Sequence, residues 1–325
     1  MSEKALKKKK ILKRIIIGVA IFIAVNYIAY LAIASPIMMK VLRDGGVNKD
    51  TSKETMSNWV QEDMGYDLDG FLAKYEIEEF TLHSDDCKDP HDIPAYYIYA
   101  EGVDTKEAPT VVMAHGMSAS HICTYPYAEL FLKKGYNVIT YDQHSFGESE
   151  EAYVSYGYFE SRDFLACVQY AVDAAGENTI GCWGQSMGGA TIENAMDEEL
   201  VKENVDFIVL DCPMGSIAES THADPVHNFT TSMLNKVVMG WSFNDQSPYK
   251  QAEGNAIPVM MVVAGKDASV SEASYNKTGE ILGESGVSYV YEQTNAEHAK
   301  VYYRDPVGYA NALDDFLLKV AGIEE

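Results

Sequence analysis

The sequence predicts an α/β protein with a mainly parallel sheet and helices on both faces. Strand-like runs occur at residues 110–114, 137–142, 178–183, 207–211, 258–264 and 287–291. The run at 258–264 is apolar throughout, as expected of a parallel strand that is buried on both faces. Segments with helical patterning separate these runs, and such alternation is typical of a parallel α/β sheet.

Chain length favours one such domain rather than two. About 290 residues follow Ser35, which suffices for one α/β domain with a small cap. The sequence contains no internal repeat. We therefore expect one compact domain from residue 76 to residue 325, preceded by a linker and approach helix at 40–75.

The N-terminal segment predicts a membrane anchor. Residues 1–14 carry six lysines and one arginine, and no charged residue occurs at 15–39. About 20 apolar residues span a bilayer core as a helix, and basic flanks stay in the cytoplasm. The sequence thus predicts a single-pass protein with its domain outside the cytoplasm. Because Ala32-Ile33-Ala34 resembles a cleavage site, secretion after cleavage near Ser35 is the alternative.

The charge of the remaining chain excludes some partners. Residues 35–325 hold 18 basic and 48 acidic side chains, a net charge of about −30. So negative a domain argues against nucleic acid and anionic substrates. The five cysteines form no C-x-x-C pair, and no clustered metal ligands occur, so we expect no metal and no cofactor.

Residues 184–188, Gly-Gln-Ser-Met-Gly, predict a nucleophilic serine. They lie between a strand-like run and a helical pattern, where a Gly-x-Ser-x-Gly motif holds its serine on a sharp, exposed turn. Gly184 and Gly188 allow the strand and helix to approach each other closely. Ser186 is therefore the expected nucleophile.

An acid and a base follow in the chain. Asp267 comes directly after the apolar run at 258–264, and His298 precedes the final helical pattern at 306–320. A serine hydroxyl becomes nucleophilic when an imidazole takes its proton, and a carboxylate orients that imidazole. We expect Asp267 and His298 in these roles. Asp211, at the end of another strand, is the alternative acid.

Two backbone N–H groups are expected to bind the oxyanion. One belongs to Met187, directly after the serine, and the other to Met117, in the loop that follows the strand at 110–114. His115 and Gly116 lie in the same loop. We expect His115 to order this loop through hydrogen bonds.

These motifs together resemble the α/β-hydrolase superfamily, in particular a bacterial branch related to serine aminopeptidase-like and monoacylglycerol-lipase-like hydrolases. The resemblance covers about residues 76–318 and includes His115-Gly116-Met117, Gly147-Glu148-Ser149 and Gly265-Lys266-Asp267. It implies an eight-stranded, mainly parallel sheet and the order serine, acid, histidine. One position departs from the family, because His144 stands where an arginine is usual.

Specificity is expected in the insert between the strands at 207–211 and 258–264. It is longer than an ordinary α/β connection, so we expect a small helical cap at about 212–256. Phe229, Met233, Val237 and Trp241 recur every four residues. This stripe either lines a substrate pocket, with Phe229 and Met233 as candidates, or packs the cap onto the domain.

The predicted function is a serine hydrolase that cleaves a carboxylic ester or a similar acyl bond of a small molecule. A peptidase, an amidase or an acyltransferase would use the same three residues. A surface binding protein that has kept the fold without turnover is a further alternative. The sequence does not indicate an oligomeric state.

Overall fold

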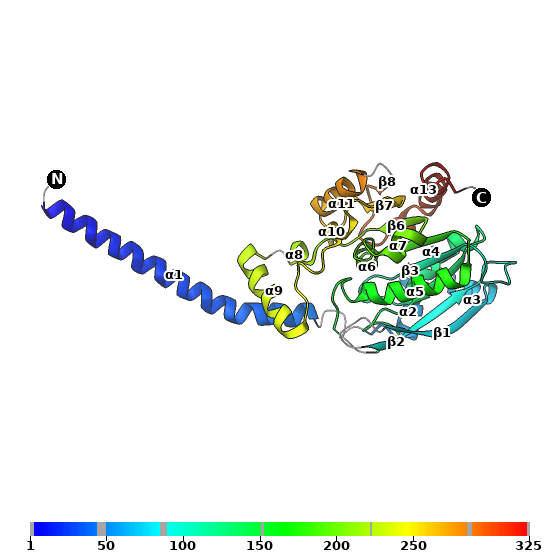
Figure 1. Cartoon of the computed structure of the whole chain (residues 1–325), viewed down its shortest axis with the longest axis horizontal. Helices are drawn as coiled ribbons and strands as arrows, with labels where there is room; N and C mark the ends of the chain where they lie inside the picture. Colours follow the sequence, from blue (N-terminus) through cyan, green and yellow to red (C-terminus); the bar gives the residue numbers. More distant parts are fainter. Residues whose placement is uncertain are drawn as a thin grey trace. The chain divides into compact units, whose positions relative to one another are not determined.

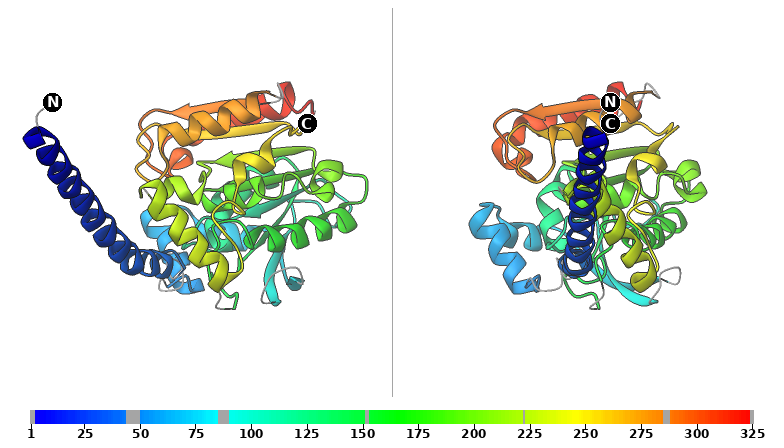
Figure 2. Two further views of the ribbon diagram at one scale, coloured as in Figure 1. Left: turned by 60° about the vertical axis from the view of Figure 1, so that its left-hand side comes forward. Right: turned by 90° about the vertical axis from the view of Figure 1, so that its left-hand side faces the viewer.

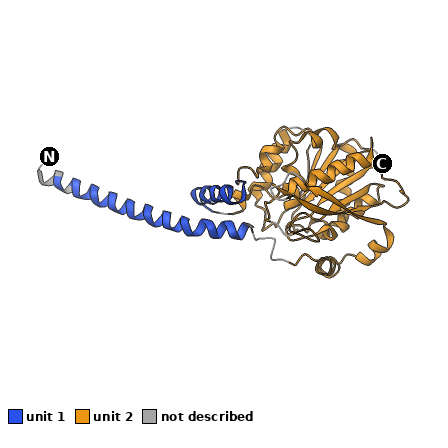
Figure 3. Ribbon diagram, turned by 60° about the horizontal axis from the view of Figure 1, so that its bottom comes forward, with its two compact units in different colours: residues 1–42, 223–242 blue, residues 43–222, 243–325 orange. Residues whose placement is uncertain are grey.

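The computed structural model describes residues 3–43, 50–84, 90–150, 153–221, 223–284 and 288–323 (Figure 1). The chain divides into two units. The smaller consists of Met1–Leu42 and Ala223–Ser242, and the larger of Arg43–His222 and Phe243–Glu325 (Figure 3).

One eight-stranded sheet organises the larger unit. Its order is β1-β2-β4-β3-β5-β6-β7-β8, in which β2 runs antiparallel to β1 and β4 and the other neighbours are parallel. The strands are β1 Ile77–Ser84, β2 His91–Ile98, β3 Thr110–Ala114, β4 Asn137–Tyr141, β5 Ile180–Gln185, β6 Phe207–Asp211, β7 Val259–Ala264 and β8 Ser288–Gln293. The predicted mainly parallel, eight-stranded sheet is confirmed.

Strand sequence explains the two layers of the core. Val111 and Met113 of β3 join one hydrophobic cluster, whereas Val112 and Ala114 join the other. Since successive side chains of a strand point to opposite faces, an all-apolar strand supplies both clusters at once.

Helices cover both faces of the sheet (Figure 2). Side chains of α4 Tyr125–Leu132 and α13 Pro306–Lys319 belong to one cluster, and those of α5 Glu160–Ala175, α7 Glu199–Asn204 and α11 Glu272–Glu284 contribute to the other. The remaining helical elements of this unit are α2 Lys53–Asn58, the π-helical turn Trp59–Asp63, α3 Leu68–Lys74, the 3₁₀ turn His121–Thr124, α6 Met187–Glu193, α8 Ile217–Ser220, α10 Pro248–Ala252 and α12 Val301–Arg304.

In its described residues, the smaller unit contains α9 Pro225–Met239 and all but the last residue of α1 Glu3–Arg43. Among the described residues, α1 is the one helix long and apolar enough to cross a membrane. It runs without a break through the predicted basic segment and the predicted anchor. Composition and length thus favour a membrane span, as the sequence predicts.

The predicted cap region contains α8, α9 and α10. Of these, α9 belongs to the smaller unit with α1, so a cap over the candidate serine stays a prediction. The apolar stripe also divides, because α9 ends before Gly240, whose left-handed φ of 85° terminates the helix. Trp241 is buried, while Phe229, Met233 and Val237 are exposed.

The described cysteines carry free thiols. All are buried, namely Cys123, Cys167, Cys182 and Cys212. Cys87 lies outside the described residues.

Candidate active site

The candidate site is built on the turn between β5 and α6. Ser186 alone separates the last residue of β5 from the first residue of α6, and its φ of 54° and ψ of −114° are unusual for a residue with a side chain. Such strained geometry persists only where surrounding contacts impose it.

Two glycines allow the close packing that surrounds this turn. A Cβ on Gly188 would lie 2.1 Å from the carbonyl oxygen of Ala114, at the end of β3. A Cβ on Gly184 would lie 2.5 Å from the carbonyl oxygen of Gly188. Real Cβ atoms do not approach oxygen so closely, so any larger residue would force α6 away from the sheet.

Backbone hydrogen bonds fix the serine against β6. The Ser186 N–H donates to the Asp211 carbonyl oxygen at 2.9 Å, and the Ser186 carbonyl oxygen accepts from the Met214 N–H at 3.0 Å. The strained residue is therefore held from both sides by the chain that leaves β6.

The structure brings Ser186, Asp267 and His298 together. His298 lies in the loop between β8 and α12. Its Nε2 lies 2.8 Å from Ser186 Oγ, and its Nδ1 lies 2.6 Å from Asp267 Oδ2. With Nδ1 protonated toward the carboxylate, Nε2 can accept the serine proton.

Asp267 is held in a fixed orientation by other donors. Its Oδ1 accepts from the N–H groups of Ser269 and Val270 at 2.7 and 2.8 Å, and the Tyr275 hydroxyl donates to its Oδ2 at 2.5 Å. Burial raises the pKa of Asp267, because it disfavours the charged carboxylate. Hydrogen bonds from His298, Tyr275 and Val270, together with the charge of His298, have the opposite effect and lower the pKa overall. The carboxylate thus stays ionised beside His298 at neutral pH.

Sequence reasoning missed Tyr275. It lies on α11, and no motif marks its contact with Asp267, because a tyrosine at a buried helix position looks like ordinary core packing.

The alternative acid, Asp211, has another partner. It is fully buried, and its Oδ2 accepts from the Tyr309 hydroxyl at 3.0 Å. Burial raises the pKa of Asp211 to about 6, although the hydrogen bond from Tyr309 acts to lower it. The hydrogen bond between His298 and a carboxylate, which the sequence predicts for the acid, is formed with Asp267.

Backbone N–H groups are available beside the serine. In the part of the chain that the structure describes, neither the Met117 N–H nor the Met187 N–H donates a hydrogen bond to protein. The loop that carries Met117 is close to the turn, since a Cβ on Gly116 would lie 3.5 Å from the Cβ of Ser186. The role of both groups as oxyanion donors stays a prediction.

His115 ties this loop to the core. Its Nδ1 lies 2.8 Å from the Gly116 carbonyl oxygen, and its Nε2 accepts from the Gln143 N–H at 3.1 Å. Complete burial lowers the pKa of His115, which keeps the ring neutral, as one donor and one acceptor nitrogen require. The hydrogen bonds match the ordering role that the sequence suggests.

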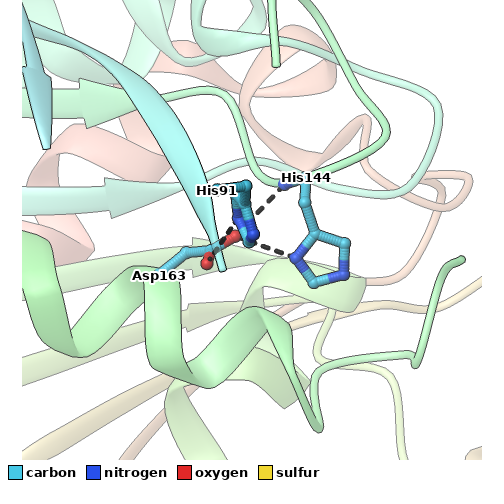
Figure 4. A group of neighbouring side chains, drawn as sticks. All are labelled: His91, His144 and Asp163. Carbon is cyan, nitrogen blue, oxygen red and sulfur yellow. Dashed lines mark hydrogen bonds and ion pairs between the residues drawn. The ribbon is translucent and has the colours of Figure 1, made fainter. Parts of the chain in front are cut away.

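His144, the position that departs from the family, forms a buried ionic cluster (Figure 4). Its Nδ1 lies 3.0 Å from Asp163 Oδ2 and its Nε2 3.3 Å from Glu160 Oε1. His91 Nε2 lies 3.0 Å from Asp163 Oδ1. Burial favours the neutral ring, but the charges of Glu160 and Asp163 raise the pKa of His144 well above its ordinary value. The carboxylates of Asp163 and Glu160 therefore favour the charged form of His144.

Among the described residues, two groups of side chains have the composition of a metal site. They are His91, His144 and Asp163, and Cys212, Asp267 and His298, each with ligand atoms within 4.8 Å of one another. Both nitrogens of His144 face the carboxylates of Asp163 and Glu160, and both nitrogens of His298 face Asp267 and Ser186.

The candidate pocket residues lie elsewhere in the chain. Phe229 and Met233 belong to α9 of the smaller unit, with 65% and 51% of each residue exposed. Their predicted role in a substrate pocket stays a prediction.

Comparison with known families identifies a related hydrolase family. The sequence model of a hydrolase family described as serine aminopeptidase, S33, matches residues 105–256. That range includes Ser186 and both expected oxyanion donors. It ends before Asp267 and His298.

Two proteins are similar in sequence, and a solved structure is similar in fold. The uncharacterized protein YqkD of Bacillus subtilis is 24% identical over 285 residues, which cover 83% of this chain and 88% of that protein. The thiohydrolase aneE of Aspergillus aculeatus is 34% identical over 116 residues, a third of each chain. The structure of the Pyrococcus furiosus esterase Pf2001 aligns with a TM-score of 0.60 at 21% identity, covering 82% of this chain and 97% of the esterase.

The effect of His144→Gln on the free energy of unfolding should depend on pH if His144 is charged in the folded protein. The pKa of His144 in the folded protein is raised above its value in the unfolded protein, which is about 6.5. Protonated His144 therefore makes its full contribution to the free energy of unfolding below that pH. The stabilisation is then lost as pH rises through the folded pKa. We expect His144→Gln to lower the free energy of unfolding by about 3–5 kcal/mol at pH 6, and by less at alkaline pH.

Urea denaturation of both proteins in detergent from pH 6 to pH 10 measures this difference. The control is His83→Gln, which removes an exposed histidine 2.9 Å from Asp92 and should cost under about 1 kcal/mol. A difference for His144→Gln that does not change with pH would mean that His144 is neutral in the folded protein.

Proposed function

Since the chain belongs to the α/β-hydrolase superfamily, we propose that it is a serine hydrolase that cleaves a carboxylic ester or a similar acyl bond. The observation that carries the proposal is the position of His298, with Nε2 at 2.8 Å from Ser186 Oγ and Nδ1 at 2.6 Å from Asp267 Oδ2. This arrangement lets the imidazole take the serine proton while Asp267 stabilises the resulting positive charge.

The proposed reaction has two steps. Ser186 Oγ attacks the acyl carbon as its proton moves to His298 Nε2, and the Met117 and Met187 N–H groups donate to the oxyanion. When the acyl–oxygen bond breaks, His298 returns the proton to the leaving alcohol. Water then attacks the acyl-enzyme through the same groups and releases the acid.

Peptide and thioester cleavage are the alternatives that the relatives suggest. The matching family is described as a serine aminopeptidase, and one relative is named a thiohydrolase. Both reactions use the same nucleophile and oxyanion donors, and they differ from ester hydrolysis in the leaving group.

We also propose that α1 anchors the protein in a membrane, with the N-terminus in the cytoplasm and the catalytic unit outside. The uncharged run at 15–39 and the basic residues before it support this orientation. Secretion after cleavage near Ser35 is the alternative.

A substrate panel tests the activity and its class together. Purified full-length protein is assayed on esters with short, medium and long acyl chains, on a thioester and on aminoacyl amides. We expect ester turnover that falls roughly a million-fold in Ser186→Ala, because the nucleophile is lost. Turnover of amides alone would favour a peptidase, transfer to an added alcohol an acyltransferase, and no turnover of any substrate a binding protein.

Exchange of each carboxylate for an amide tests the acid assignment. Asp267→Asn should lower kcat by about ten-thousand-fold, since the amide no longer stabilises the histidine tautomer and charge that the reaction needs. The matched control is Asp211→Asn, which keeps a hydrogen-bond acceptor for Tyr309 and should lower kcat less than about tenfold. The opposite ranking, with unchanged thermal unfolding, would assign the acid to Asp211.

A further inference from the structure

The two helices of the smaller unit meet through polar groups. The Tyr27 hydroxyl donates to Asp224 Oδ1 at 2.6 Å, and the Ser35 and Thr230 hydroxyls lie 2.8 Å apart. The ring of Tyr30 contacts the ring of His227 edge-on at 5.5 Å. In these contacts, later residues of α1 meet later residues of α9. The two helices therefore run in the same direction, with α9 beside the second half of α1.

The outer faces of the same helices are apolar. Phe229, Met233 and Val237 recur every four residues on α9 and are 65%, 51% and 80% exposed. The corresponding residues of α1 are also more than half exposed, namely Ile28, Ile33, Ile37 and Val41. Since residues four apart share one face of a helix, α9 presents a continuous apolar stripe.

Charge is almost absent from α9. Lys236 is the one charged side chain among the residues of α9, whereas 23% of the whole chain is charged. Asp224, which precedes the helix, accepts from the Tyr27 hydroxyl and from the N–H groups of Val226 and His227 through a single oxygen. These three donors stabilise its carboxylate.

In this pair of helices, polar groups lie at the contact between the helices and apolar side chains face outward. This is the reverse of the pattern found in proteins surrounded by water. Lipid favours this reversed pattern, because hydroxyl groups between helices then find partners while apolar side chains meet acyl chains. An apolar stripe of this length on a soluble surface would instead mark an aggregation or docking site.

The position of α9 along α1 matches one half of a bilayer. At a rise of 1.5 Å per residue, residues 15–39 extend about 37 Å, against about 30 Å for a bilayer core. The contacts with α9 begin at Tyr27 and extend to Met38. They therefore fall in the half of the span farther from the basic N-terminus.

We infer that α9 embeds in the outer leaflet of the membrane beside α1, with Phe229, Met233 and Val237 against lipid acyl chains. These residues then form a membrane-binding surface instead of the substrate pocket that the sequence suggests. Cleavage near Ser35 would remove the partner of Asp224 and His227, so the pairing also favours a retained anchor. The inference rests on the proposed anchor and does not depend on hydrolytic activity.

Photo-crosslinking from the stripe tests this inference. Phe229, Met233 and Val237 are replaced one at a time by photoreactive benzoylphenylalanine in the full-length chain, which is reconstituted in vesicles of phosphatidylethanolamine and phosphatidylglycerol. We expect phospholipid adducts at least tenfold above those from matched replacements of Val290 and Val307, exposed residues of the catalytic unit. Crosslinks to the catalytic unit, crosslinks to a second copy, or no adduct would each overturn the inference.

A second measurement requires no substitution. The wild-type chain in vesicles that contain a diazirine-bearing phospholipid is irradiated, digested and mapped by mass spectrometry. Adducts are expected on α1 and on residues 225–239, and none on 306–319. Labelling of α1 without labelling of 225–239 would keep the anchor and overturn the role of α9.

Discussion

The strained backbone of Ser186 is the constraint on which the rest of the site depends. A non-glycine residue at φ 54° persists because β5 and α6 meet around it. They can meet because Gly184 and Gly188 carry no side chain at positions where a Cβ would clash with backbone oxygens. The hydrogen bonds of Ser186 with Asp211 and Met214 hold the turn in place. The serine thus projects from a rigid scaffold.

Parallel strands explain why distant residues meet at that turn. β5, β6, β7 and β8 are successive neighbours and run in the same direction, so their carboxyl ends share one edge of the sheet. Ser186 follows β5, Asp267 follows β7 and His298 follows β8. The loop after β3 supplies Met117 at the same edge, because β3 pairs with β5.

Local patterns predicted most of this arrangement. The strands at 110–114 and 207–211 have the predicted bounds, and β5 ends two residues beyond its prediction, at Gln185. Long-range contacts without a local signal were missed, such as the Tyr275 hydroxyl on Asp267 and the cluster of His144 with Asp163. Spacing alone also could not assign Phe229 and Met233, since one apolar stripe suits a pocket, a packing face or a lipid surface.

Labelling of the serine tests the central claim most directly. A fluorophosphonate probe reacts with serines that a neighbouring base activates, and mass spectrometry identifies the modified residue. We predict that the folded full-length chain is modified at Ser186, and that labelling is lost in His298→Ala and after denaturation. A folded chain in which Ser186 stays unmodified, or in which His298→Ala labels as fast as wild type, would contradict the account.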